Sequence, residues 1–186
     1  MIPIVFFVIV ELSLRAFQYG GNVDLVVKRV IEGKELFSIN RSVAKRYFAH
    51  AGVAIPEPAD DTFEIIKPDK TIRIFCLGES TMAGFPYEFN ATAPRLLHDR
   101  LRTAFPDYHF EVINAGTAAV GSYVVRDFLK ELLSFEPDLF VVYVGHNEFY
   151  GIYQPGSSLK SIGGHWLTTL AIKMLGEMQQ TIDRRK

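Results

Sequence analysis

The stretch TIRIFCLGESTMAG, residues 71–84, decides how this chain is interpreted. It joins a short, nearly uninterrupted apolar run to a glycine-flanked serine. Such a run is typical of a parallel strand covered on both faces, whereas a half-exposed strand alternates. Gly78 ends the run, and the small polar residues Ser80 and Thr81 suit the entry of a helix, where free backbone N–H groups favour negative charge. Ser80 is therefore placed either to meet an anion or oxyanion or simply to cap that helix.

Length and composition indicate one globular domain. The chain has 186 residues, of which 48% are hydrophobic and 22% charged, and this usage argues against wholesale disorder. A formal net charge of -1 without a dense basic stripe argues against nucleic acid as a partner. Cys76 is the only cysteine, so an internal disulfide and a thiol-rich metal site are both excluded. We expect no cofactor.

An apolar run lies near the N-terminus, within a segment that we define as residues 1–19. Residues 2–10, IPIVFFVIV, carry no charge, but a spanning helix needs roughly 20 mostly apolar residues. The run could be the end of a membrane anchor, the apolar part of a signal sequence or a core strand. A signal sequence would have a preceding basic residue, which is missing, and Arg15 suits the interfacial flank of an anchor. We therefore expect a membrane-anchored protein whose main domain lies outside the cytoplasm.

Residues 20–70 show weak organisation, and we predict an irregular connecting arm. Residues 55–61, IPEPADD, contain two prolines and three acids that disfavour regular structure. Within the arm, residues 42–49 could form a short helix and residues 63–66 a brief edge strand before Pro68. The arm would lead to the main domain.

From residue 71 onward the chain alternates strands and helices. We predict strands at 72–77, 109–113 and 139–144, with amphipathic helices at 91–104 and 123–135. Strand–helix–strand units give parallel strands, so the fold class is α/β, a three-layer α/β/α flavodoxin-like arrangement around a parallel sheet. Each strand runs into a glycine-marked polar loop, and all three loops should leave the carboxyl edge of the sheet, where ligands bind. That edge would hold Ser80, Gly116 and Asn147.

Three short blocks follow the three strands: GES at 78–80, NAG at 114–116 and GHNE at 145–148. Within residues 71–151 these blocks resemble the SGNH, or GDSL-like, esterase and lipase superfamily. The resemblance implies that Ser80 is the nucleophile, and that the N–H groups of Ser80 and Gly116 form the oxyanion hole with the Asn147 side chain. The GHNEFYG sequence and the apolar N-terminus look most like the membrane-anchored bacterial branch of that superfamily. Glu79 stands where the family often has aspartate.

The general base is not evident in the sequence. The family takes its acid and base from a late Asp-x-x-His motif, which this chain lacks. His146 lies beside the site and His165 follows two glycines, but a structural role is the simpler interpretation of each. The other histidines are His50, His98 and His109. A doubly wound sheet normally has about five or more strands, so we expect residues 71–186 to be an N-terminal part of a hydrolase-like domain whose base lies beyond Lys186. Residues 166–182 are predicted to form an amphipathic helix.

The sequence therefore predicts a serine esterase or acyl hydrolase of the SGNH type. Its substrates would be small-molecule or carbohydrate O-acyl esters, O-acetyl carbohydrates among them, and as a fragment it should be inactive or weak. The alternative is a non-catalytic module that keeps the fold and binds a small oxyanion or a partner. A P-loop is excluded because no Lys-Ser or Lys-Thr follows Gly84. The α/β-hydrolase elbow is excluded because Met82 replaces the second glycine of G-x-S-x-G.

Overall fold

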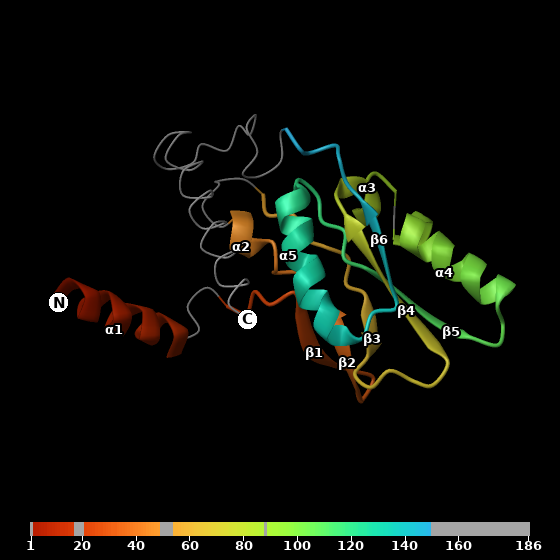
Figure 1. The fold of residues 1–186 in the computed structure, drawn as a ribbon, viewed down its shortest axis with the longest axis horizontal. Helices are drawn as coiled ribbons and strands as arrows, with labels where there is room; N and C mark the ends of the chain where they lie inside the picture. Colours follow the sequence, from red (N-terminus) through yellow and green to blue (C-terminus); the bar gives the residue numbers. More distant parts are fainter. Residues whose placement is uncertain (1, 17–20, 49–53, 88, 150–186) are drawn as a thin grey trace, which may run out of the picture.

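The described part of the chain, residues 2–16, 21–48, 54–87 and 89–149, contains two three-stranded sheets, one parallel and one antiparallel (Figure 1). The structure is a computed structural model. Helices flank the parallel sheet, so the fold is mixed α/β, as predicted. The helix predicted at 166–182, like His50 and His165, lies outside the described residues.

The parallel sheet has the strand order β5-β4-β6. Its strands are β4 (Thr71–Gly78), β5 (His109–Asn114) and β6 (Leu139–Tyr143), which agree with the predicted strands to within one residue at either end. Ile74 of β4 pairs with Val112 on one side and Leu139 on the other. β4 is therefore central, and its apolar run is buried because both of its faces are covered.

The chain crosses the parallel sheet on both faces. α4 (Ala93–Ala104) leads from β4 to β5 and packs Leu97 and Leu101 against Cys76. α5 (Ser122–Leu132) leads from β5 to β6 and buries Phe128 against Phe75, on the opposite face of β4. Right-handed crossovers that run in opposite directions across a sheet lie on opposite faces, which explains this arrangement. Three short helices complete this part: α3 (Ser80–Ala83), η1 (Phe89–Ala91) and η2 (Leu133–Phe135).

The described residues of the segment before β4 form regular strands and a short helix, which corrects the predicted irregular arm. β1 (Val26–Ile31), β2 (Lys34–Ile39) and β3 (Thr62–Glu64) form the antiparallel sheet, and α2 (Lys45–Phe48) follows β2. The short helix and the edge strand predicted within the arm are present in shortened form. Leu25, Ile39 and Phe63 belong to the same buried core as Phe75. Because that core is shared with distant residues, local sequence patterns did not reveal it.

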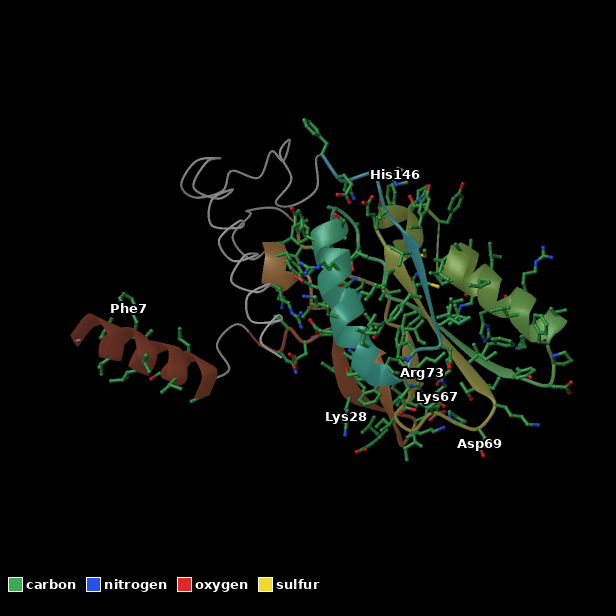
Figure 2. All side chains as sticks on the ribbon, viewed as in Figure 1. Phe7, Lys28, Lys67, Asp69, Arg73 and His146 are labelled. Atoms are coloured by element: carbon green, nitrogen blue, oxygen red, sulfur yellow. The ribbon has the colours of Figure 1, made fainter. Side chains whose placement is uncertain are left out.

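A buried arginine joins the two sheets. Arg73 of β4 is 1% exposed, and its Nε donates to Glu111 Oε2 of β5 at 2.6 Å. Its terminal nitrogens donate to the backbone oxygens of Phe135 (2.8 Å) and Glu64 (2.9 Å), and its charge lies 4.9 Å from the centre of the Phe63 ring. A buried charge is stable only when it is paired and hydrogen-bonded. Figure 2 shows Arg73 far from His146, toward the end of the sheet where β4 begins.

α1 (Ile2–Ala16) lies apart from both sheets (Figure 1). It has 15 residues, and its large apolar side chains are exposed, among them Phe6, Phe7 and Leu12. Within the described residues, we find no helix that combines the length and the apolar character needed to cross a membrane.

Candidate functional site

Three loops meet at the carboxyl edge of the parallel sheet, because β4, β5 and β6 are parallel. The chain leaves β4 toward β5 on one side and returns past it to β6 on the other. β4 is thus the strand at which the strand order reverses, which is where ligands of open α/β sheets bind. The loops carry the three predicted site residues: Ser80, Gly116 and Asn147.

Ser80 is separated from β4 by Glu79 alone and is the first residue of α3. The N-cap of this helix is Glu79, and the Ser80 hydroxyl makes no hydrogen bond with any described residue. The hydroxyl therefore does not act as a helix cap, which was the simpler of its two predicted roles. Gly78 lets β6 approach, since an added Cβ would lie 2.3 Å from the carbonyl oxygen of Tyr143. Ser80 is partly exposed.

Glu79 makes contacts that the sequence did not reveal. Its side chain is fully buried, and its carboxylate accepts the backbone N–H of Gly145 (Oε1, 3.1 Å) and of Asn147 (Oε2, 3.0 Å). His146 Nδ1 lies 3.6 Å from Oε2. The loop after β6 is thus held to the residue that precedes Ser80. The sequence signal for this contact was an acid placed between a buried strand and a serine.

Asn147 provides a donor without an acceptor. Its side-chain Nδ2 is buried and has no hydrogen-bond partner among the residues that the structure describes. An unsatisfied buried polar group costs about 1–3 kcal/mol, so each one calls for a reason. An acyl-transfer site provides one, because it needs donors aimed at the oxygen that becomes negative in the transition state.

Gly116 packs tightly against α3. A Cβ added to it would lie 2.5 Å from the backbone nitrogen of Ala83, so only glycine allows this approach. Its N–H donates to Asn114 Oδ1 at 2.9 Å, while Asn114 Nδ2 donates to the Met82 carbonyl at 3.1 Å. A substrate oxygen would therefore have to share the Gly116 N–H with Asn114. The structure identifies Asn114 as the side chain that holds this loop, whereas the sequence showed it only as part of the NAG block.

The described histidines differ in their distance from the site. His109 begins β5, at the opposite end of the sheet from Ser80, with Nδ1 3.3 Å from Thr71 Oγ1. His98 lies in α4, with Nδ1 3.5 Å from Asp99 Oδ1. His146 lies at the site edge with its side chain 54% exposed, and its ring packs edge-on against Tyr143 with 5.4 Å between ring centres.

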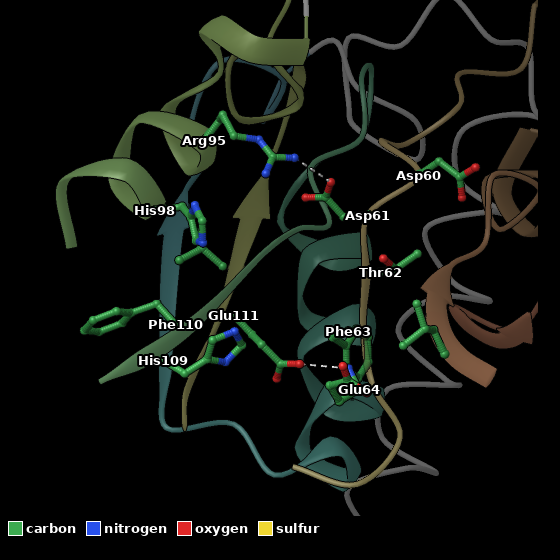
Figure 3. A pocket seen from close by; sticks show the side chains of 12 residues that line it. Asp60, Asp61, Thr62, Phe63, Glu64, Arg95, His98, His109, Phe110 and Glu111 are labelled. Carbon is green, nitrogen blue, oxygen red and sulfur yellow. Dashed lines mark hydrogen bonds and ion pairs between the residues drawn. The ribbon is translucent and has the colours of Figure 1, made fainter. Parts of the chain in front are cut away.

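A cavity of about 350 Å³ lies between β3, β5 and α4, away from the site edge (Figure 3). The carboxylates that line it are already paired. Asp61 accepts the backbone N–H of Asn114 at 2.8 Å and faces Arg95 at 3.6 Å, while Glu111 accepts the N–H of Glu64 at 2.8 Å. These contacts stabilise the junction of the two sheets, so we assign the cavity to the fold.

Metal binding and thiol chemistry find little support in the described residues. They contain no group of three or more His, Cys, Asp or Glu side chains placed to hold a metal ion. Cys76 is buried in β4, and burial raises the pKa of its thiol to about 12. A thiol of that kind packs the core and does not act as a nucleophile at neutral pH.

Comparison with known proteins gives partial structural matches. No family model and no curated protein matches the chain. Among solved structures, it is similar to the crystal structure of AlinE4, described as an SGNH-hydrolase family esterase, with 25% identity and a TM-score of 0.37 over 42% of each chain. Two variants of that esterase match over the same share and with the same TM-score, at 25% and 23% identity. The chain spans 42% of the length of these esterases, and a TM-score this low does not establish a common fold.

Proposed function

We propose that this chain carries the nucleophile and the oxyanion donors of a serine esterase, an acyl hydrolase of the SGNH type. One observation carries the proposal: the buried Nδ2 of Asn147, which has no hydrogen-bond partner among the described residues, lies at the sheet edge that also holds Ser80. A fold that only had to be stable would gain from pairing that donor. An enzyme gains from leaving it for the transition state.

In the proposed reaction, Ser80 Oγ attacks the acyl carbon of an ester and its proton passes to a general base. The carbonyl oxygen becomes an oxyanion that accepts hydrogen bonds from Asn147 Nδ2 and the backbone N–H of Ser80. Gly116 N–H is the third donor, shared with Asn114. The alcohol then leaves, and water hydrolyses the acyl-serine. Each donor typically contributes about 3 kcal/mol of transition-state stabilisation.

The general base limits the rate that we expect. The chain has no Asp-x-x-His motif, and a serine without a base lacks about 10²- to 10⁴-fold of catalysis. The oxyanion donors alone can still leave a measurable rate. We therefore expect weak hydrolysis of activated esters by this chain, with small-molecule or carbohydrate O-acyl esters, O-acetyl carbohydrates among them, as the substrate class.

The second candidate function is a non-catalytic module that binds a small oxyanion. The hydrogen bond from Gly116 N–H to Asn114 Oδ1 favours it, because one of the three donors is already used within the protein. Such a module would keep the Asn147 donor but would not need the Ser80 hydroxyl.

Hydrolysis of p-nitrophenyl acetate by the whole chain distinguishes the two functions. We expect Ser80→Ala to abolish turnover above buffer and Asn147→Ala to reduce it. Ser134→Ala is the matched control. Ser134 lies beyond the end of α5, where its hydroxyl donates to the Glu131 carbonyl, and its removal should leave the rate unchanged. Turnover that survives Ser80→Ala would overturn the esterase proposal. Acetate binding that depends on Asn147 but not on Ser80 would favour the binding module.

We also propose that α1 holds the protein at a membrane, with the hydrolase loops outside the cytoplasm. The support is its row of exposed apolar side chains, which include Phe6, Phe7 and Ile9. Replacing Phe6 and Phe7 by glutamate should release the protein from phospholipid vesicles in a co-sedimentation assay. Equal sedimentation of the two proteins would contradict the proposal.

A further inference from the structure

We propose that Glu79 is a positioning residue, which sets the orientation of the Asn147 side chain through the backbone of the loop after β6. The inference rests on the proposed function, in which Asn147 Nδ2 stabilises the oxyanion. Glu79 itself touches no reacting atom in this scheme.

The Glu79 side chain anchors the loop after β6 by two hydrogen bonds. The carboxylate is fully buried, and each of its oxygens accepts one backbone N–H of the loop, from Gly145 at 3.1 Å and from Asn147 at 3.0 Å. Hydrogen bonds to an ionised acceptor are roughly twice as strong as neutral ones. Although Glu79 occupies the N-cap position of α3, its side chain makes no capping bond to that described helix. The side chain is therefore committed to the neighbouring loop.

Side-chain packing on that loop includes the His146 ring, which lies edge-on against Tyr143 with 5.4 Å between ring centres. At Gly145 an added Cβ would meet no described atom within 4 Å, and Val144 beside it is exposed. The other anchor is Glu148, whose carboxylate accepts the N–H and the hydroxyl of Ser122 at the start of α5, both at 2.8 Å. Asn147 thus lies between two carboxylate anchors. Of the two anchors, Glu79 is the one that directly precedes Ser80 in the chain.

Two consecutive residues, Glu79 and Ser80, connect the oxyanion donor to the nucleophile, because Glu79 holds Asn147 and Ser80 is the nucleophile. Ser80 follows Glu79 in the chain, so the residue that carries the attacking oxygen and the residue that holds Asn147 share one peptide bond. Glutamine at position 79 would keep the size of the side chain but would offer one acceptor oxygen and turn an NH₂ group toward an N–H. The loop would have to shift, and a displacement of about 1 Å can lower a rate roughly 100-fold.

A double-mutant cycle on p-nitrophenyl acetate hydrolysis by the whole chain tests the proposal. We expect Glu79→Gln to lower kcat by about 10- to 100-fold with KM little changed, because the loss concerns the transition state. In an Asn147→Ala background the same change should have almost no further effect. Asp138→Asn is the matched control, since Asp138 accepts the Arg73 N–H at the other end of the sheet and should leave kcat unchanged.

The outcomes separate this proposal from the proposed function. If Glu79→Gln causes the same loss with and without Asn147, Glu79 has only a structural role and the proposal fails, while the esterase assignment stands. If Asn147→Ala has no effect on a Ser80-dependent rate, the assigned oxyanion donor is wrong and the proposal falls with it.

Hydrogen exchange of the unmodified chain provides a test that does not depend on folding of the variant. The amides of Gly145 and Asn147 should exchange more slowly than those of the exposed neighbours Val144 and His146. Equal exchange at all four positions would overturn the anchor, because it would mean that the carboxylate does not hold the loop.

Discussion

The two ends of β4 treat their polar groups in opposite ways. At the amino end, Arg73 is buried with acceptors for its guanidinium, and Asp138 accepts its backbone N–H at 2.6 Å. At the carboxyl end, Asn147 Nδ2 and Thr117 Oγ1 are buried with no hydrogen-bond partner among the described residues. The buried polar groups named here are therefore hydrogen-bonded at the amino end of β4, which we call the saturated end, and lack a described partner at the carboxyl end.

This difference supports the proposed function, because a fold gains stability from pairing its buried polar groups. The most conspicuous buried charge, Arg73, belongs to the fold, because its partners are other parts of the frame. The groups at the other end keep an energetic penalty that a purely structural edge would lose, and such penalties gather at functional sites. Four substitutions test whether the contrast is real.

The largest effect should follow from removing the buried ion pair at the saturated end of β4. Arg73→Met leaves the Glu111 carboxylate buried without its cation, and we expect the free energy of unfolding to fall by about 3–5 kcal/mol. Urea denaturation followed by circular dichroism measures the loss. Adding Glu111→Leu should recover much of it, since an apolar pair of similar size can replace a buried ion pair. A single variant as stable as the parent would show that Arg73 does not hold the sheets together.

A smaller loss should follow from filling the contact between Gly116 and α3. The new methyl group of Gly116→Ala would lie 2.5 Å from the backbone nitrogen of Ala83, and overpacking of this kind costs about 1–3 kcal/mol. Thermal denaturation should show the decrease, and ester hydrolysis should fall with it because Ala83 lies in the helix that Ser80 begins. An unchanged melting temperature would mean that Gly116 and α3 are not in close contact.

Asp138→Asn should show a pH-dependent effect at the saturated end. Burial acts to raise the pKa of Asp138, but hydrogen bonds from Lys67 and from the Arg73 N–H outweigh it and hold the pKa below its ordinary value of 3.8. A depressed pKa stabilises the fold above the ordinary value, and the stabilisation is lost as the pH falls through the folded-state value. Because the carboxylate is 43% exposed, we expect a loss of only about 1 kcal/mol at pH 7.

Urea denaturation at several pH values checks this prediction. The difference between the parent and Asp138→Asn should be full at pH 7 and should shrink below pH 3.8. Asp107→Asn, on an exposed turn, is the control and should change stability little at any pH. A difference that persists at acid pH would assign the effect to packing.

The smallest effect should have the opposite sign. Thr117→Val replaces a fully buried hydroxyl that has no partner among the described residues, and we expect stability to rise by up to about 1 kcal/mol. Thr92→Val is the matched control, because Thr92 is also buried but its hydroxyl accepts the Arg95 N–H at the start of α4. That variant should lose about 1 kcal/mol. A lower melting temperature for Thr117→Val than for Thr92→Val would contradict the prediction, because it would mean that the hydroxyl without a described partner stabilises the fold more than the hydrogen-bonded one.

The parallel sheet was predictable from sequence because its pattern is local. The apolar runs of β4 and β6, with glycine or a polar loop after each, identify strands without knowledge of their neighbours, although only β4 is buried along its length. Parallel pairing then brings Ser80, Gly116 and Asn147 to one edge. Their catalytic roles remain predictions, since placement at one edge does not test them.

The antiparallel sheet was not predicted because its signals are weak or distant. β1 contains Lys28 and Arg29 and is mostly exposed, so it lacks a strong alternation. The local signal was the two-residue turn Glu32–Gly33, in which both residues have positive φ angles of 52° and 81°, as a tight hairpin requires. The partners of Arg73 and Glu79 could not be predicted at all, because they come from other elements, β3, β5, η2 and the loop after β6, whose placement depends on the tertiary fold.

The contacts of the arm have a mechanical consequence. Leu25 N–H and the Arg46 guanidinium both bond to Glu131 of α5, and Asp61 holds the backbone N–H of Asn114, whose side chain supports the Gly116 loop. These described parts of the arm are therefore bound to the parallel-sheet unit and do not behave as a flexible linker, whose end-to-end distance would grow as about the square root of its residue number. A force applied to the arm at Leu25 reaches α5 through Glu131, and a force applied at Asp61 reaches the Gly116 loop through Asn114.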